Sequence, residues 1–131
     1  MNELIYQIEN NISLSEFREL LVASTLGERR PIDDPHRLEK MLVHANLIIT
    51  ARDAGKLVGI ARSLTDQAFC TYLSDLAVHG DYQHKGIGKE LVFRTKKAFP
   101  EAKIILISAP KAVGFYPKIG MTKHDNCYIL F

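Results

Sequence analysis

A glycine-rich turn in the middle of the chain carries the residues best suited to chemistry. It reads Gln83-His84-Lys85-Gly86-Ile87-Gly88-Lys89, with the apolar run Leu76-Ala77-Val78 before it and an amphipathic segment after it. The first turn of a helix offers free backbone N–H groups and the positive end of the helix dipole, roughly half a charge. Glycines let an anion approach the backbone, and Lys85 and Lys89 add positive charge. The pattern predicts a pyrophosphate site.

The same two glycines also have a purely structural interpretation. Gly86 would then be a loop glycine, and Gly88 would allow close helix packing. The turn is not a Walker A loop, because the pattern Gly-x-x-x-x-Gly-Lys-Ser/Thr is absent. It also departs from a dinucleotide fingerprint, since the preceding strand is not the first of a βαβ unit. Taken alone, the turn leaves both interpretations open.

A second segment makes the interpretation more specific. Gln83-x-x-Gly86-x-Gly88, following Leu76-Ala77-Val78, resembles the acyl-CoA-binding signature of the GNAT superfamily of N-acetyltransferases. Downstream, the run Ala112-Val113-Gly114-Phe115-Tyr116-Pro117-Lys118-Ile119-Gly120-Met121 is similar to that family's Ala-x-x-Phe-Tyr-x-Lys-x-Gly-Phe segment. One helix and one strand separate the two motifs, as they do in the family. The resemblance covers residues 46–131 well, and only the order of elements before them.

The resemblance implies a role for each motif. Backbone amides of residues 84–89 would hold the pyrophosphate of acetyl-CoA, the cosubstrate, and the strand edge at 76–78 would pair with its pantetheine arm. An N–H near Val78 would polarise the thioester carbonyl. Tyr116 matches the tyrosine that commonly protonates the leaving thiolate, although it could instead be a packing tyrosine. The implied reaction is direct attack by a neutral primary amine, of a small molecule or a protein, on the thioester.

The second catalytic candidate is Asp75, which lies on the predicted cofactor strand. Two interpretations stay open for it. It could accept the proton of the amine or bind a cationic substrate, or it could bond backbone amides at a bulge in the strand. Water is an alternative to a dedicated general base.

The acceptor pocket is expected among residues 13–45 and the hairpin 50–63, where the family varies most. A polar loop in the first of these regions carries charges of both signs. Its arginines, Arg29 and Arg30, could bind a carboxylate, while Asp33 and Asp34 could bind an amine. Asp34 is also explained as the N-cap of a helix that begins at the next proline.

Hydrophobic periodicity predicts the elements that position these residues. Strands are expected at residues 4–8, 47–50, 57–63, 69–78, 104–107 and 127–131, and helices after Ser13, after Asp34, at 86–99 and from 109 to 120. The continuous apolar run 104–107 predicts a strand covered on both faces. An antiparallel meander followed by a helical crossover implies a mixed sheet. The fold class is therefore α/β (α+β), GNAT-like, with a mostly antiparallel central sheet, about four helices and a splayed cofactor cleft.

Composition and charge limit which partners, metals and cellular compartments are expected. The 131 residues, 47% hydrophobic and 24% charged, predict one globular domain spanning 1–131. A net charge of +2 without a basic stripe argues against a nucleic-acid partner. The five histidines lack zinc-ligand spacing, so no metal is expected. Two lone cysteines, no signal-peptide pattern and no apolar stretch near 20 residues predict a cytoplasmic protein without a membrane partner.

Two other functions compete with the N-acetyltransferase. One is a non-catalytic acyl-CoA-binding module that holds its ligand as a sensor or a structural group. The other is a nucleotide-binding or interaction domain with no link to coenzyme A. The presence of Gln83, Gly86, Gly88 and Tyr116 together favours the enzyme. The exposed edges of a small mixed sheet are compatible with a homodimer, which the sequence does not establish.

Overall fold

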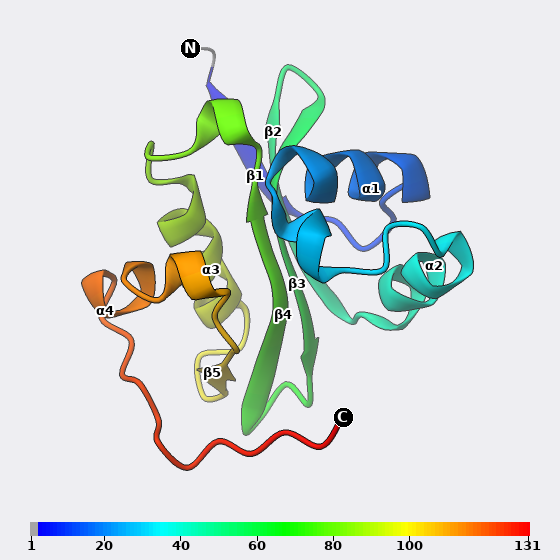
Figure 1. Ribbon diagram of the computed structural model, residues 1–131. Coiled ribbons are helices and arrows are strands. Elements are labelled where there is room, and N and C mark those ends of the chain that lie inside the picture. The colour runs from blue at the N-terminus through cyan, green and yellow to red at the C-terminus, as the bar shows by residue number, and fades with distance from the viewer. Residues whose placement is uncertain (1–2) are drawn as a thin grey trace.

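A computed structural model describes residues 3–131 and shows one five-stranded sheet with helices on both faces (Figure 1). The elements are β1 (Leu4–Ile8), α1 (Leu14–Ala23), the 3₁₀ turn η1 (Leu26–Arg29), α2 (Pro35–His44), β2 (Leu47–Asp53), β3 (Lys56–Thr65), β4 (Cys70–Val78), the 3₁₀ turn η2 (Gly80–Tyr82), α3 (Ile87–Ala98), β5 (Lys103–Ile105), the 3₁₀ turn η3 (Pro110–Ala112) and α4 (Phe115–Lys118). Strands β1 to β4 are antiparallel neighbours, and β5 joins β4 in parallel. The predicted mixed, mostly antiparallel sheet is confirmed.

The helices begin at the capping residues that the sequence predicts. Ser13 Oγ accepts a hydrogen bond from the N–H of Glu16 at 3.2 Å, which starts α1. Asp34 Oδ1 accepts from the N–H of Arg37 at 3.1 Å, and a proline occupies the first position of α2. In contrast, α3 starts after Gly86, which lies in the left-handed region and supplies no capping side chain. The first backbone N–H groups of α3 are therefore free to donate to another partner.

The core has two halves, one on each face of the sheet. Helices α1 and α2 cover the first face, where Phe17 and Leu38 pack on Ile60 of β3. Helix α3 covers the second face, where its Ile87 and Leu91 pack with Val58 of β3 and Leu73 of β4 in the second hydrophobic cluster, the α3-side cluster. Figure 1 shows α4 on the same side as α3. This arrangement brings the chain before α3 and the segment around α4 to the same side of β4.

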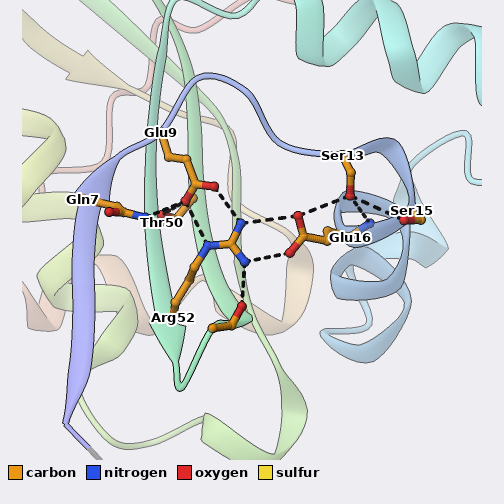
Figure 2. Close-up of polar contacts among 8 residues, drawn as sticks. Gln7, Glu9, Ser13, Ser15, Glu16, Thr50 and Arg52 are labelled. Carbon is orange, nitrogen blue, oxygen red and sulfur yellow. Dashed lines mark hydrogen bonds and ion pairs between the residues drawn. The ribbon is translucent and has the colours of Figure 1, made fainter.

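A cluster of charges around Arg52 of β2 joins this strand to the end of β1 and to the first turn of α1 (Figure 2). The Arg52 guanidinium donates to both carboxylate oxygens of Glu9, at 2.9 and 2.7 Å, and to Glu16 at 2.6 Å. It also donates to the carbonyl of Gly55 in the β2–β3 turn at 2.8 Å. These hydrogen bonds from Arg52 hold the pKa of Glu9 at about 2, well below its ordinary 4.5, and lower the pKa of Glu16 in the same way.

We expect this cluster to make stability depend on acid pH. Because the folded-state pKa of Glu9 lies below 4.5, its contribution is fully present above pH 4.5 and is lost as the pH falls toward about 2. Arg52→Met should lower the free energy of unfolding at pH 7 by about 1–3 kcal/mol. The gap between variant and wild type should narrow between pH 5 and pH 3 in urea unfolding. Arg94→Met, which breaks the exposed pair with Glu90 and the cation–π contact with the Tyr6 ring, is the control and should cost no more than about 1 kcal/mol. A gap that stays constant with pH would contradict this account.

Three expectations for the last part of the chain are wrong. Strand β5 covers only Lys103–Ile105, and Ile105 and Ile107 are each 45% exposed, so the run 104–107 is not covered on both faces. The predicted helix 109–120 breaks into η3 and α4, with Gly114 between them. Residues 127–131 form no strand, because no segment within residues 3–131 pairs with them.

Across residues 3–131, none of the helices combines the length and apolar character that a bilayer crossing requires.

Candidate active site

A cleft of about 630 Å³ opens where β4 ends. Its walls are the end of β4, the turn that leads into α3, η1 with the residues just before it, and the segment 109–116. Strands β4 and β5 pair only from Cys70↔Lys103 to Tyr72↔Ile105, so no ladder joins them beyond Tyr72. The two strands therefore diverge toward the cleft, and the predicted splayed arrangement matches the observed fold.

The end of β4 directs main-chain donors into this gap. The N–H of His79 donates to the carbonyl of Val58 on β3 at 2.8 Å. Because successive N–H groups of a strand point to opposite sides, the N–H groups of Leu76 and Val78 point away from β3, toward the side where β5 has diverged. The Gln83 side-chain amide donates to the Val78 carbonyl at 3.1 Å and ties the turn to the strand.

The turn into α3 has the backbone geometry of an anion site. His84 and Gly86 both adopt the left-handed conformation, with φ of 63° and 83°. The first helical hydrogen bond runs from the N–H of Glu90 to the carbonyl of Gly86 at 3.1 Å. The N–H groups of residues 87–89 therefore have no acceptor within the helix, and Lys89 adds a positive charge among the residues that line the cleft.

The other predicted cation, Lys85, lies elsewhere. Its ammonium sits 5.6 Å from the centroid of the Tyr82 ring, and Lys85 is not among the residues that line the cleft. Tyr82 in turn donates its hydroxyl to Asp53 at 2.6 Å, which fastens the turn to the β2–β3 hairpin. The Lys85 charge therefore lies outside the cleft, beside Tyr82, and would act on a bound anion only at longer range.

The two glycines of the turn serve different physical purposes. A Cβ added to Gly86 would meet no atom within 4 Å, so its role is the positive φ that starts α3. A Cβ on Gly88 would lie 3.3 Å from the ring of Phe115 and 3.9 Å from Val78. Gly88 therefore allows Phe115 to approach the first turn of α3. The helix-packing interpretation is thus correct for Gly88. The packing that it allows, against Phe115, forms part of the wall of the cleft.

Tyr116 also lines the cleft, beside Phe115, whose ring centroid lies 5.0 Å away. Burial raises the pKa of the Tyr116 phenol above its ordinary 10, so the group stays protonated at neutral pH and can donate a proton. Within residues 3–131 no group accepts a hydrogen bond from its hydroxyl, whereas Tyr82 shows the satisfied partner that a packing tyrosine usually has.

Asp75 does not reach the cleft. Its side chain is fully buried, and each carboxylate oxygen accepts from an arginine, Arg30 Nε at 2.5 Å and Arg62 Nε at 2.5 Å. Arg30 also donates to the Ser74 carbonyl at 2.7 Å, and Arg62 donates to the Ser74 hydroxyl at 2.9 Å. The geometry fits neither interpretation offered by the sequence, because the carboxylate bonds guanidinium groups rather than backbone amides and faces no substrate space.

An extra residue in β4 explains this orientation. Arg62 pairs with Asp75 and the next residue of β3 pairs with Leu73, so Ser74 is a bulge. The bulge breaks the simple alternation of the strand. Leu73 and Leu76 both contact the α3-side cluster, while Asp75 faces Arg62, which donates to the Met41 carbonyl at the α2 side. The bulge therefore aims Asp75 at η1 and anchors that turn on β4 through Arg30.

Of the four charged loop residues considered for the acceptor, one lines the cleft. Arg29 does so, together with Glu28, which the sequence analysis did not single out. Arg30 is held by Asp75, Asp34 caps α2, and the Asp33 side chain is 96% exposed beside Arg18. Arg62 was also missed, although a charge at an apolar position of the run 57–63 is a recognisable anomaly. Among residues 3–131, no three His, Cys, Asp or Glu side chains gather as a metal site.

Comparison with known proteins gives one consistent family. The acetyltransferase (GNAT) domain family matches residues 28–128. An uncharacterized N-acetyltransferase, ycf52, of Pyropia yezoensis is 33% identical over 130 residues, which cover 93% of this chain and 72% of that protein. The glucosamine 6-phosphate N-acetyltransferase of Schizosaccharomyces pombe is 29% identical over 86 residues, 59% of this chain and 78% of that protein. The structure of a GNAT family acetyltransferase from Streptococcus pneumoniae has a TM-score of 0.81 at 26% identity, with 98% and 96% of the two chains covered.

Proposed function

The chain belongs to the GNAT family of acetyltransferases, and from this premise we propose that it transfers an acetyl group from acetyl-CoA to a primary amine of a small molecule or a protein. The observation that carries the proposal is the composition of one cleft. The first residues of α3, the last residues of β4 and Tyr116 all line it, so their amides and phenol would be available to a ligand there. These are the donors that a pyrophosphate, a pantetheine arm and a leaving thiolate require.

The donors of the cleft suit acetyl-CoA, which supplies the activated thioester. The N–H groups of residues 87–89 and the Lys89 ammonium would hold the pyrophosphate. The main chain of Leu76 and Val78 would bind the pantetheine arm, and the Val78 N–H would stabilise negative charge on the thioester oxygen. Tyr116 would protonate the thiolate as it leaves, since a thiol has an ordinary pKa near 8.5.

The acceptor amine would approach from the η1 side of the cleft and attack in its neutral form. Because Asp75 is enclosed by two arginines, the proton of the amine would pass to water rather than to that carboxylate. Asp75 would act by positioning η1 against the bulge at Ser74. Glu28 and Arg29 would then contact the acceptor from η1.

Thermal unfolding with acetyl-CoA, CoA, ATP and NAD, each in excess, tests the proposal. A ligand at about 100 times its dissociation constant stabilises the native state by about 2.7 kcal/mol, several degrees for a domain of this size. We expect a shift with acetyl-CoA and CoA alone. A screen of primary amines for release of free CoA thiol then separates an enzyme from a non-catalytic acyl-CoA-binding module, which would be stabilised without turnover. No shift with either CoA species would refute the proposed site.

Tyr116→Phe should lower kcat about 100-fold while leaving the stabilisation by acetyl-CoA nearly unchanged. The substitution removes the proton donor and keeps the ring that packs beside Phe115. Steady-state CoA release with the best amine of the screen gives kcat and KM separately. Tyr128→Phe is the matched control, because Tyr128 is an exposed tyrosine outside the cleft. An unaltered kcat, with chemistry rate-limiting, would remove Tyr116 from the mechanism.

A further inference from the structure

The charged side chains of residues 28–34 fall into two groups. Three have partners elsewhere in the fold: Arg30 with Asp75, Asp33 with Arg18, and Asp34 with the N–H of Arg37. Glu28 and Arg29 differ, because within residues 3–131 only their backbone groups take part in hydrogen bonds and neither side chain forms an ion pair. Both residues are exposed and line the cleft. A carboxylate and a guanidinium, neighbours in sequence, are therefore available to a ligand in this wall.

The turn η1, which carries these two charges, is held in place at both ends. Thr25, the residue before η1, has a φ of 71°, in the left-handed region that a β-branched residue rarely adopts. Ser24 Oγ donates to the Leu21 carbonyl at 3.0 Å on one side of it, and Arg30 donates to Asp75 at the other end of η1. Thr25 also lines the cleft. Backbone strain persists where the surrounding structure over-determines it, and it gathers at ligand sites. The backbone that carries the two charges is therefore fixed against the cleft.

We propose, resting on the acetyl transfer proposed above, that the acceptor is a small molecule with an anionic group, a carboxylate or a phosphate, close to its primary amine. Arg29 binds the anion, because a guanidinium pairs with either group through two parallel hydrogen bonds. Glu28 attracts the amine, which arrives mostly protonated, since an alkylammonium has an ordinary pKa of about 10.4. The Cα atoms of these consecutive residues lie about 3.8 Å apart, so the amine and the anion belong to one compact molecule.

Matched pairs of amines test this acceptor class. β-Alanine and propylamine have similar shapes, but only the first carries a carboxylate, and phosphoethanolamine and ethanolamine form the corresponding phosphate pair. We expect kcat/KM, measured by release of free CoA thiol, to be at least about 10-fold higher for the anionic member of a pair, the usual effect of a hydrogen bond between charged groups. The difference should lie mainly in KM, because Arg29 binds the anion and not the reacting atoms.

Reversing one charge should reverse the preference. Arg29→Glu should lower kcat/KM for β-alanine at least about 10-fold and should favour the corresponding terminal diamine, whose second ammonium takes the place of the carboxylate. Arg29→Lys keeps the charge without the planar fork and should retain part of the preference for anions. Lys40→Glu makes the same change of charge at an exposed residue of α2 outside the cleft, and this matched control should leave the preference unchanged. Acetyl-CoA should stabilise the wild type and all three variants equally in thermal unfolding.

The outcomes that overturn this acceptor class differ from the one that refutes the enzyme. Equal kcat/KM within both pairs, turnover confined to amines without an anionic group, or a preference that Arg29→Glu leaves unchanged would each show that Arg29 binds no anion of the acceptor. Loss of stabilisation by acetyl-CoA in Arg29→Glu would place Arg29 against the cosubstrate instead. All of these results leave acetyl transfer standing. Stabilisation by acetyl-CoA without CoA release from any amine would reject the transferase, and the acceptor class with it.

Discussion

Asp75→Ala should lower the free energy of unfolding by about 3–5 kcal/mol, the usual cost of removing one partner from a buried ion pair. The native carboxylate is fully buried and accepts from Arg30 and Arg62. Without it, the guanidinium of Arg62, whose side chain is 5% exposed, keeps its charge but has no other ion-pair partner among residues 3–131. Because Arg30 also loses its carboxylate, η1 should detach from β4 before the rest of the molecule unfolds.

Urea unfolding at pH 7 measures this loss. Asp33→Ala is the matched control, since that carboxylate is exposed, and it should change stability by no more than about 0.5 kcal/mol. A double-mutant cycle tests the mechanism: Arg30→Met should cost less in the Asp75→Ala background than in wild type, because the two residues share one interaction. Equal costs in both backgrounds, or a loss below about 1 kcal/mol for Asp75→Ala, would show that this pair does not anchor η1.

Gly88→Asp should weaken the binding of CoA and acetyl-CoA at least about 100-fold while the protein stays folded. A Cβ at this position already lies 3.3 Å from Phe115, so a larger side chain displaces that ring or turns into the cleft. The added carboxylate also lies in the first turn of α3, where it competes with the pyrophosphate for the positive end of the helix dipole and repels it. Both effects act on the ligand rather than on the core.

Ligand-induced stabilisation, titrated to give dissociation constants, measures the effect. Gly88→Ala separates the two causes, because it presses on Phe115 without adding charge and should give an intermediate loss. Lys97→Asp introduces a carboxylate at the opposite end of α3 and should bind CoA as the wild type does. Wild-type affinity in a folded Gly88→Asp protein would mean that the first turn of α3 does not hold the pyrophosphate.

Local chemistry made much of the fold predictable. The caps at Ser13 and Asp34 act over three residues, so their hydrogen bonds follow from the order of side chains along the chain. The turn around Gly55 and the left-handed start of α3 at Gly86 follow in the same way from backbone freedom. The candidate site could be predicted for the same reason: the glycine-rich turn and the segment around Tyr116, which both line one cleft, are each contiguous in sequence.

Contacts between distant segments were decided only by the tertiary structure. The partners of Asp75 depend on one bulge in β4, whose position the side-chain pattern does not predict. The bulge directs the carboxylate away from the cleft and toward Arg30, which lies 45 residues away in sequence. The need for glycine at position 88 depends on how closely Phe115 approaches. Residues 127–131 show the same limit, because strand propensity is an intrinsic property but a strand forms only where an edge is within reach. The sequence alone determined the elements from β1 to α3, the glycine-rich turn and the family; register and packing decided the elements after α3 and which side chains face the cleft.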